Sequence, residues 1–83
     1  MHTICLFGND YASPTDVHLA IKRLLNLPEY YGLNADALID CLSELKECPA
    51  MWFRTDECTE DVKACLLLTA RVFMETGAKV KEM

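Results

Sequence analysis

The sequence predicts an α/β fold in which a three-stranded parallel sheet packs against helices. Short apolar runs of strand length alternate along the chain with longer segments whose apolar residues recur at helical spacing. Strands that are separated by helices have to pair in parallel, because a tight hairpin joins only antiparallel neighbours. With 83 residues, 52% of them hydrophobic, the chain can build one core. We therefore expect a single domain over residues 1–83.

The first strand and the first helix are predicted before residue 28. Thr3 to Phe7 form a short apolar run that Gly8-Asn9-Asp10 closes, which is typical of a buried strand. Ser13 then offers an N-cap, and Pro14 suits the first position of a helix. Pro28 marks the end of this helix. Its apolar face consists of residues at helical spacing: Val17, Ile21, Leu24 and Leu25.

A second helix, a second strand, a long third helix and a short last strand follow. Asn34 is a suitable N-cap for a helix to about Lys46, and residues 50–53 are typical of a buried strand. Thr59 caps a helix from Glu60 to about Glu75. Residues 78–82 are the third candidate strand, with a poor apolar pattern. Apolar residues nearly encircle the long helix, which we expect to be the most buried: Val62, Leu66, Leu67, Leu68, Val72 and Phe73.

The charge balance favours a basic partner. The chain has 13 acidic and 8 basic residues and a net charge of −5, the wrong sign for a nucleic-acid backbone. We therefore expect no direct nucleic-acid binding, and faster association with a basic protein through electrostatic steering. No stretch approaches the roughly 20 apolar residues of a membrane span, and the N-terminal apolar run is too short for a signal peptide. We expect a cytoplasmic protein that does not bind membranes.

The cysteines and histidines are expected to be structural. The odd number of cysteines, without a C-x-x-C pair, predicts free thiols in a reducing compartment: Cys5, Cys41, Cys48, Cys58 and Cys65. Cys41 and Cys65 fall on apolar helix faces, so we expect them to be buried, and we expect His18 to be structural as well. A zinc site from Cys48, Cys58 and Cys65 with His2 or His18, or a reactive thiol, stays an alternative. Without a nucleophile turn or a Gly-rich phosphate loop, we expect no enzyme and no cofactor.

The predicted second helix separates its residues into two faces. At about 100° per position, one face consists of Leu38, Cys41, Leu42 and Leu45. The opposite face consists of Asp36, Ile39, Asp40 and Ser43, which Glu47 would join in a longer helix. This acidic face is open to two interpretations: a solvated surface, or a recognition face that the adjoining Tyr30 and Tyr31 enlarge. A third, an acid and base pair of carboxylates, lacks the burial that would separate two pKa values.

Residues 27–42 carry a long motif with fixed gaps, L-P-x-Y-Y-G-x-N-x-D-A-L-x-D-C-L. This motif resembles the barstar family, whose members are intracellular inhibitors of bacterial ribonucleases. Upstream, Ser13-x-x-Asp16-Val17-His18 and the basic, leucine-rich end of the first helix extend the likeness, so that it covers residues 11–42. Looser agreement continues to Gly77-Ala78. The resemblance implies the same fold, a three-stranded parallel sheet with helices.

The resemblance also implies a site and a mechanism. In that family, the second helix and the loop before it plug the ribonuclease active site, and the last helical aspartate of the motif, Asp40 here, lies where the RNA phosphate would lie. Asp36 would pair with a basic group at the rim, and Tyr30 would stack against the enzyme. The implied partner-binding residues are Tyr30, Gly32, Asn34, Ala35, Asp36, Ile39, Asp40, Glu75 and Thr76.

The predicted function is inhibition of a small basic ribonuclease of the extracellular, barnase-like type by a module that is a monomer when free. Ile39 stands where the best-known family member has a tryptophan, and Val72 and Thr76 stand where it has two contacting glutamates. These differences leave an alternative open, in which the same fold binds a non-ribonuclease toxin or a regulatory protein. The short extra helix that the family has before the long helix is also absent from the pattern.

Overall fold

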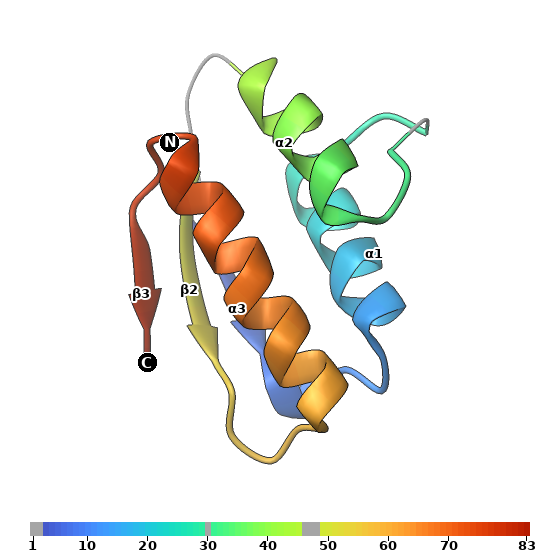
Figure 1. Cartoon of the computed structure of the whole chain (residues 1–83), viewed down its shortest axis with the longest axis vertical. Coiled ribbons are helices and arrows are strands. Elements are labelled where there is room, and N and C mark those ends of the chain that lie inside the picture. Colours follow the sequence, from blue (N-terminus) through green and yellow to red (C-terminus); the bar gives the residue numbers. More distant parts are fainter. Residues whose placement is uncertain (1–2, 30, 46–48) are drawn as a thin grey trace.

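In the computed structural model, which describes residues 3–29, 31–45 and 49–83, three parallel strands form one sheet beside three α-helices (Figure 1). The elements follow one another as β1 (Thr3–Phe7), the 3₁₀ turn η1 (Gly8–Asp10), α1 (Pro14–Leu25), α2 (Ala35–Ser43), β2 (Ala50–Arg54), α3 (Glu60–Glu75) and β3 (Val80–Glu82). The predicted α/β fold with a three-stranded parallel sheet is therefore confirmed. No short helix stands between β2 and α3, where every residue is described.

The strands stand in the order of the sequence, with β2 in the centre of the sheet. β1 pairs with β2 from Thr3 opposite Ala50 to Phe7 opposite Arg54, and β3 pairs with β2 through Val80 opposite Met51. α1 and α2 lie between β1 and β2 in the chain, and α3 lies between β2 and β3. These helical connections let each strand re-enter the sheet in the same direction.

The helices within the described ranges cover one face of the sheet. Its inward residues are buried: Ile4, Leu6, Met51 and Phe53. Trp52 and Cys5 alternate with them and face outward, and Trp52 is 40% exposed. The strands predicted to be buried are therefore buried on one face, because the helices lie on one side of the sheet (Figure 1). On the open face, Lys81 Nζ lies 5.1 Å from the centre of the Trp52 ring.

The helix starts follow the predicted caps. The side chains of Ser13, Asn34 and Thr59 accept backbone N–H groups at the start of α1, α2 and α3, respectively. α2, however, ends at Ser43 rather than near Lys46. Its last turn tightens, because the N–H groups of Glu44 and Leu45 donate to carbonyls three residues back. Lys46 and Glu47 lie outside the described residues.

α3 lies across the sheet and supplies the centre of the core. Phe73, Leu66 and Val62 have no exposed surface, and they pack with residues of the strands and of the other helices. α3 has the most buried residues of the three helices, as predicted, but Leu67 and Leu68 of its apolar set are 44% and 48% exposed. One side of α3 faces the core and the other faces solvent. Apolar residues occur on both sides, so some of them stay exposed.

The cysteines that the structure describes are free thiols. Cys41 and Cys65 are buried, as predicted, and burial raises the pKa of both thiols. Cys48 lies outside the described residues, as does His2. In the described ranges, no helix combines the length and apolar content needed to cross a membrane.

Candidate partner-binding face

α2 separates its polar and apolar residues as the helical spacing predicts. Leu38, Cys41 and Leu42 are buried against the core. On the opposite side, the two carboxylates Asp36 and Asp40 are exposed together with Ser43, and Ile39 between them is 37% exposed. The outer face of α2 therefore presents two carboxylates with one apolar side chain between them. We call Asp36, Ile39, Asp40 and Ser43 the acidic face.

Neither carboxylate of the acidic face forms an ion pair within residues 3–29, 31–45 and 49–83. Asp36 lies in the first turn of α2, where the helix dipole favours a negative charge. Asp40 has no such benefit, and a like charge four residues away destabilises a helix slightly. The carboxylate of Asp40 therefore costs the isolated fold stability, and it stays available to a cation outside the chain.

Asn34 joins the loop before α2 to the helix itself. Its Oδ1 accepts the N–H of Ala37 at 2.8 Å, and its Nδ2 donates to the carbonyl of Gly32 at 3.2 Å. A Cβ atom at Gly32 would lie 3.2 Å from Asn34 Nδ2, which is tighter than ordinary contacts. Glycine therefore leaves room for the amide that fixes the start of α2. An asparagine N-cap typically stabilises a helix by about 1 kcal/mol.

Leu33, between these two residues, has the left-handed φ of 56°. A residue with a Cβ costs roughly 1–2 kcal/mol in this conformation. The side chain of Leu33 is partly buried and packs against the core, which offsets that cost. These contacts hold the loop against the start of α2, and so they set where the residues of the acidic face point.

Tyr31 lies in the core and not on the acidic face. It is 4% exposed, and its hydroxyl lies 2.5 Å from His18 Nδ1 on α1. Burial lowers the pKa of His18 and raises the pKa of Tyr31 well above its usual value, so both groups are neutral near pH 7. The interpretation that Tyr31 enlarges a recognition face was therefore wrong, whereas the structural role expected of His18 is confirmed. Tyr30 lies outside the described residues.

The other predicted partner-binding residues lie at the start of α2 and at the end of α3. Gly32 is exposed and Ala35 half-buried, both at the N-terminal end of α2. Glu75 is exposed at the end of α3, and Figure 1 places the C-terminal ends of α2 and α3 at the same end of the molecule. Thr76 is half-buried, and its hydroxyl donates to the carbonyl of Phe73 at 2.8 Å.

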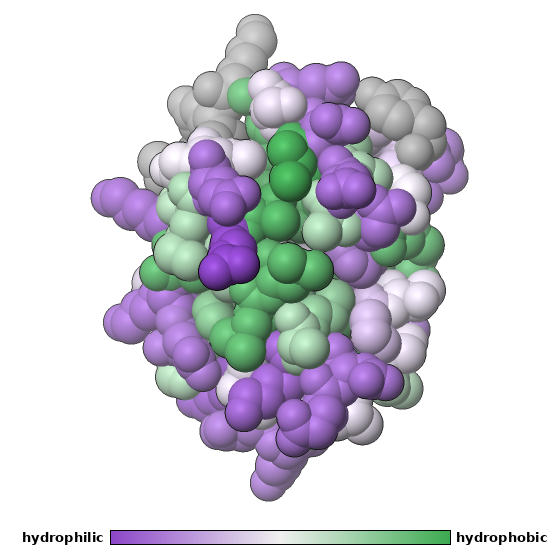
Figure 2. Space-filling model, viewed as in Figure 1, coloured by the Kyte–Doolittle hydropathy of each residue, from purple (hydrophilic) through white to green (hydrophobic). Residues whose placement is uncertain are grey.

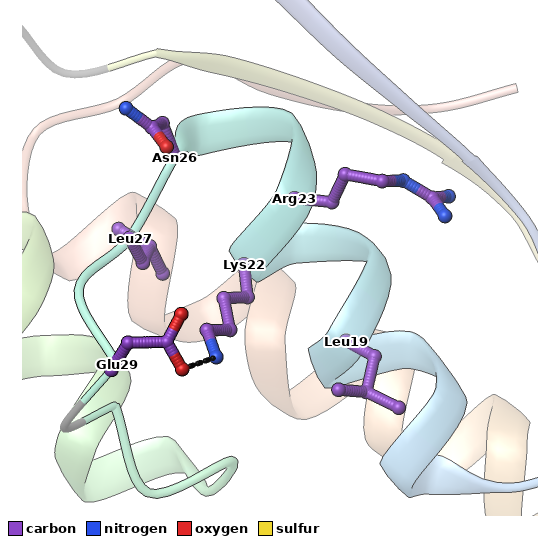
Figure 3. A pocket seen from close by; sticks show the side chains of 6 residues that line it. All are labelled: Leu19, Lys22, Arg23, Asn26, Leu27 and Glu29. Carbon is purple, nitrogen blue, oxygen red and sulfur yellow. Dashed lines mark hydrogen bonds and ion pairs between the residues drawn. The ribbon is translucent and has the colours of Figure 1, made fainter.

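A hollow of about 500 Å³ at the C-terminal end of α1 has the opposite charge character (Figure 3). Lys22 Nζ lies 3.1 Å from Glu29 Oε2 in this hollow, while Arg23 points away from that pair. Leu19 and Leu27 supply its apolar surface. With one ion pair and one further basic side chain, this hollow does not share the negative charge of the acidic face.

The pattern of the sequence did not reveal a second hollow, an apolar groove between the N-terminal parts of α1, α2 and α3. Its walls come from segments far apart in the chain, so no single periodic pattern contains it. The one indication of this groove in the sequence is that α3 has apolar residues nearly all round, and that pattern also predicts a buried helix. Among the residues described, no three His, Cys, Asp or Glu side chains gather as a metal ion would require.

The fold and the acidic face describe a small α/β domain with an outward acidic helix, and comparison with known proteins assigns it to a family. The family described as Barstar (barnase inhibitor) matches residues 1–75. The chain therefore belongs to the barstar family, a family of inhibitors and not of enzymes, and the resemblance seen in residues 27–42 is confirmed.

One curated relative is the Bacillus subtilis (strain 168) protein named Putative ribonuclease inhibitor YrdF. It is 39% identical to this chain over 49 residues, which are 59% of this chain and 54% of the relative. The matched part thus spans about half the length of that protein.

Proposed function

We propose that this protein inhibits a small basic ribonuclease of the extracellular, barnase-like type by laying α2 over the phosphate-binding part of the enzyme's active site. Membership of the barstar (barnase inhibitor) family supports the inhibitory role. The observation that carries the mechanism is the acidic face, on which Asp36 and Asp40 are exposed and form no ion pair with other described residues.

The proposed mechanism is mimicry of a phosphate group. A ribonuclease holds a phosphodiester with Arg, Lys and His side chains, and the same groups can bind a carboxylate that a rigid helix presents. Asp40 occupies the phosphate position, and Asp36 pairs with a cation at the rim of the site. The net charge of −5 adds long-range attraction to a basic enzyme. Because the helix is held by Asn34 and by its buried side, little ordering is needed on binding.

The remaining residues of the proposed interface surround this pair. Tyr30 stacks against the enzyme, and the backbone at Gly32 and Asn34 adds hydrogen bonds. Ile39 supplies the apolar contact between the two carboxylates, and Ala35 extends it toward the N-terminal end of α2. Glu75 and Thr76 contact the partner from the end of α3. We propose that the free inhibitor is a cytoplasmic monomer that protects the cell from its own ribonuclease.

The test is RNA cleavage by a panel of small secreted ribonucleases, barnase included, titrated with the chain. We expect one-to-one inhibition of at least one enzyme. Asp40→Ala should weaken this inhibition at least 30-fold, since removing one member of a buried charge pair typically costs about 2–5 kcal/mol. Asp56→Ala removes the same charge from the loop after β2, at the other end of the molecule from the end of α2, and should change inhibition less than about twofold (Figure 1).

Two results would count against the proposal. If the chain in excess inhibits no ribonuclease of the panel, the inhibitory role is lost. If Asp40→Ala inhibits as well as the unchanged chain, the enzyme is blocked by another surface, and phosphate mimicry by α2 is the wrong mechanism.

A second candidate function is binding of a non-ribonuclease partner, such as another toxin or a regulatory protein. The burial of Val72, which is 3% exposed, favours it, because this position of α3 offers a partner no carboxylate. The half-buried Thr76, with its hydroxyl bonded to Phe73, offers none either. A pull-down from native lysate separates the two functions, since recovery of a ribonuclease alone would remove the second.

A further inference from the structure

An open apolar groove of about 350 Å³ adjoins the N-terminal end of α2. Leu33 and Ala35 line it at the start of α2, Ala64, Cys65 and Leu68 line it from α3, and His18 lines it from α1. Figure 2 shows the wider setting, with hydrophobic side chains gathered over the middle of α3 and toward α2, and hydrophilic ones around them. The groove therefore adjoins a largely hydrophobic part of the face that Figure 2 shows.

Two of these wall residues are unfavourable for the free chain. Leu68 is 48% exposed, although a polar residue at this outward position of α3 would leave the core intact. Leu33 holds its side chain at the groove from a left-handed backbone conformation that Gly or Asn adopts more easily. An exposed leucine gains its transfer free energy only when another surface removes it from water.

The charges around the groove indicate what kind of surface fits it. Asp61 lies at the groove itself, and Asp36 follows directly after the wall residue Ala35. The structure gives neither carboxylate an ion-pair partner among the described residues. An apolar side chain flanked by Lys or Arg would complement both the floor of the groove and its edges.

We infer that the groove receives an apolar side chain of the same basic ribonuclease that α2 blocks, carried on a loop beside that enzyme's cationic residues. This inference rests on the proposed function. It extends the interface past the acidic face, because Asn34 and Ala35 line the groove and also belong to the proposed partner-binding residues. The acidic face then supplies charge recognition, and the groove supplies apolar burial beside it.

α3 offers a matched pair of variants for the test. Leu67 and Leu68 are neighbouring leucines of similar exposure, 44% and 48%, but only Leu68 lines the groove. With the ribonuclease that the unchanged chain inhibits, Leu68→Ser should raise the inhibition constant about tenfold, the loss expected for a leucine that binding buries further. Leu67→Ser should raise it less than about twofold, and Leu68→Met, which keeps the apolar contact, should restore binding.

The salt dependence gives a second measurement. The loss caused by Leu68→Ser should be the same at low and high salt, because it is an apolar contact. The loss caused by Asp40→Ala should shrink as salt is added, since salt screens charge pairs. Circular dichroism and urea unfolding of all variants verify that the fold is unchanged.

The outcomes separate this inference from the proposed function. If the unchanged chain inhibits a ribonuclease but Leu68→Ser and Leu67→Ser behave alike, the groove is not a contact and the proposed function stands. If the chain inhibits no ribonuclease, both fall. If sedimentation shows a dimer of the free chain that Leu68→Ser abolishes, a second copy covers the groove, and the inference is overturned.

Discussion

α2 and α3 pack against each other but present opposite kinds of surface to solvent. The 9 residues of α2 place Asp36 and Asp40 outward, whereas the 16 residues of α3 place Leu67 and Leu68 there. Neither choice helps the free chain, because like charges four residues apart destabilise a helix slightly, and exposed leucines leave apolar surface in water. Residues that break such local rules without a gain in stability are expected where a protein binds a partner.

The inner sides of the two helices also differ in what they contribute. α3 supplies the centre of the core, whereas α2 is a shorter helix that depends on its N-cap and on the loop before it. We therefore expect substitutions on the inner side of α3 to act mainly on stability. Substitutions at the start and on the outer face of α2 should act mainly on binding. The following experiments test this division, beginning with the largest expected effect.

Phe73→Ala should destabilise the protein most. Phe73 has no exposed surface, and removing a buried phenylalanine ring typically costs about 3–5 kcal/mol. That is a large part of the 5–15 kcal/mol by which a small domain is usually stable. Met74→Ala, at the next position of α3 but 57% exposed, is the control and should change the unfolding free energy by less than about 0.5 kcal/mol. Urea unfolding followed by circular dichroism measures both variants. Equal losses of stability would show that Phe73 does not lie on the core-facing side of α3.

Tyr31→Phe tests the bond that fixes the loop before α2 to α1. The substitution keeps the ring but leaves His18 Nδ1 buried without its partner, which typically costs about 1–3 kcal/mol. The same unfolding experiment measures it. A variant as stable as the unchanged protein would show that the contact between the hydroxyl and the imidazole contributes nothing.

Asn34→Ala should give a smaller loss of stability, about 1 kcal/mol, because the N–H of Ala37 loses its cap. Its effect on binding also tests the difference between α2 and α3, because fraying at the start of α2 would displace Asp36. We expect inhibition to weaken by more than the loss in folded population explains, whereas Thr59→Ala, which removes the matching cap of α3, should lower stability without that excess. A binding loss of equal size in both variants would contradict the division between the helices.

The pH dependence of stability should be smallest near neutral pH and grow in acid. Burial lowers the pKa of His18 in the folded protein below the value of 6.5 that it has when unfolded. The unfolded state therefore takes up a proton first, so this contribution is fully present above pH 6.5 and is lost as the pH falls through the folded pKa. Urea unfolding at a series of pH values should show the decline, and it should be shallower in His18→Gln. An unchanged slope in that variant would assign the pH dependence to other groups.

Much of the fold was predictable because its signals are local. Ser13, Asn34 and Thr59 mark the starts of the three helices, and each side chain accepts the backbone N–H that a cap is expected to accept. The end of α2 was not predictable to the residue, because no Gly or Pro marks it and the last turn simply tightens after Ser43.

Which faces of the helices and strands are covered could be determined only from the tertiary structure. The spacing of α2 shows which residues share a side, and its polar side could only face outward. Trp52 and Leu68 give no such indication, because an apolar residue fits either side of its element, and packing between distant segments decides which one is covered. For the same reason Tyr31, next to Tyr30 in the motif, was assigned to the surface, although it is buried and its hydroxyl contacts His18 of α1.

Competition with a nucleotide tests the central claim, that α2 covers the phosphate-binding site of the ribonuclease, most directly. The Kd of the chain for a ribonuclease that it inhibits is measured by calorimetry at increasing concentrations of a 3′-mononucleotide, with sodium chloride at matched ionic strength as the control. The apparent Kd should rise in proportion to the nucleotide concentration once the nucleotide's own Kd is exceeded. A Kd that does not change with nucleotide would show that α2 binds away from the phosphate site, and it would contradict the mechanism proposed here.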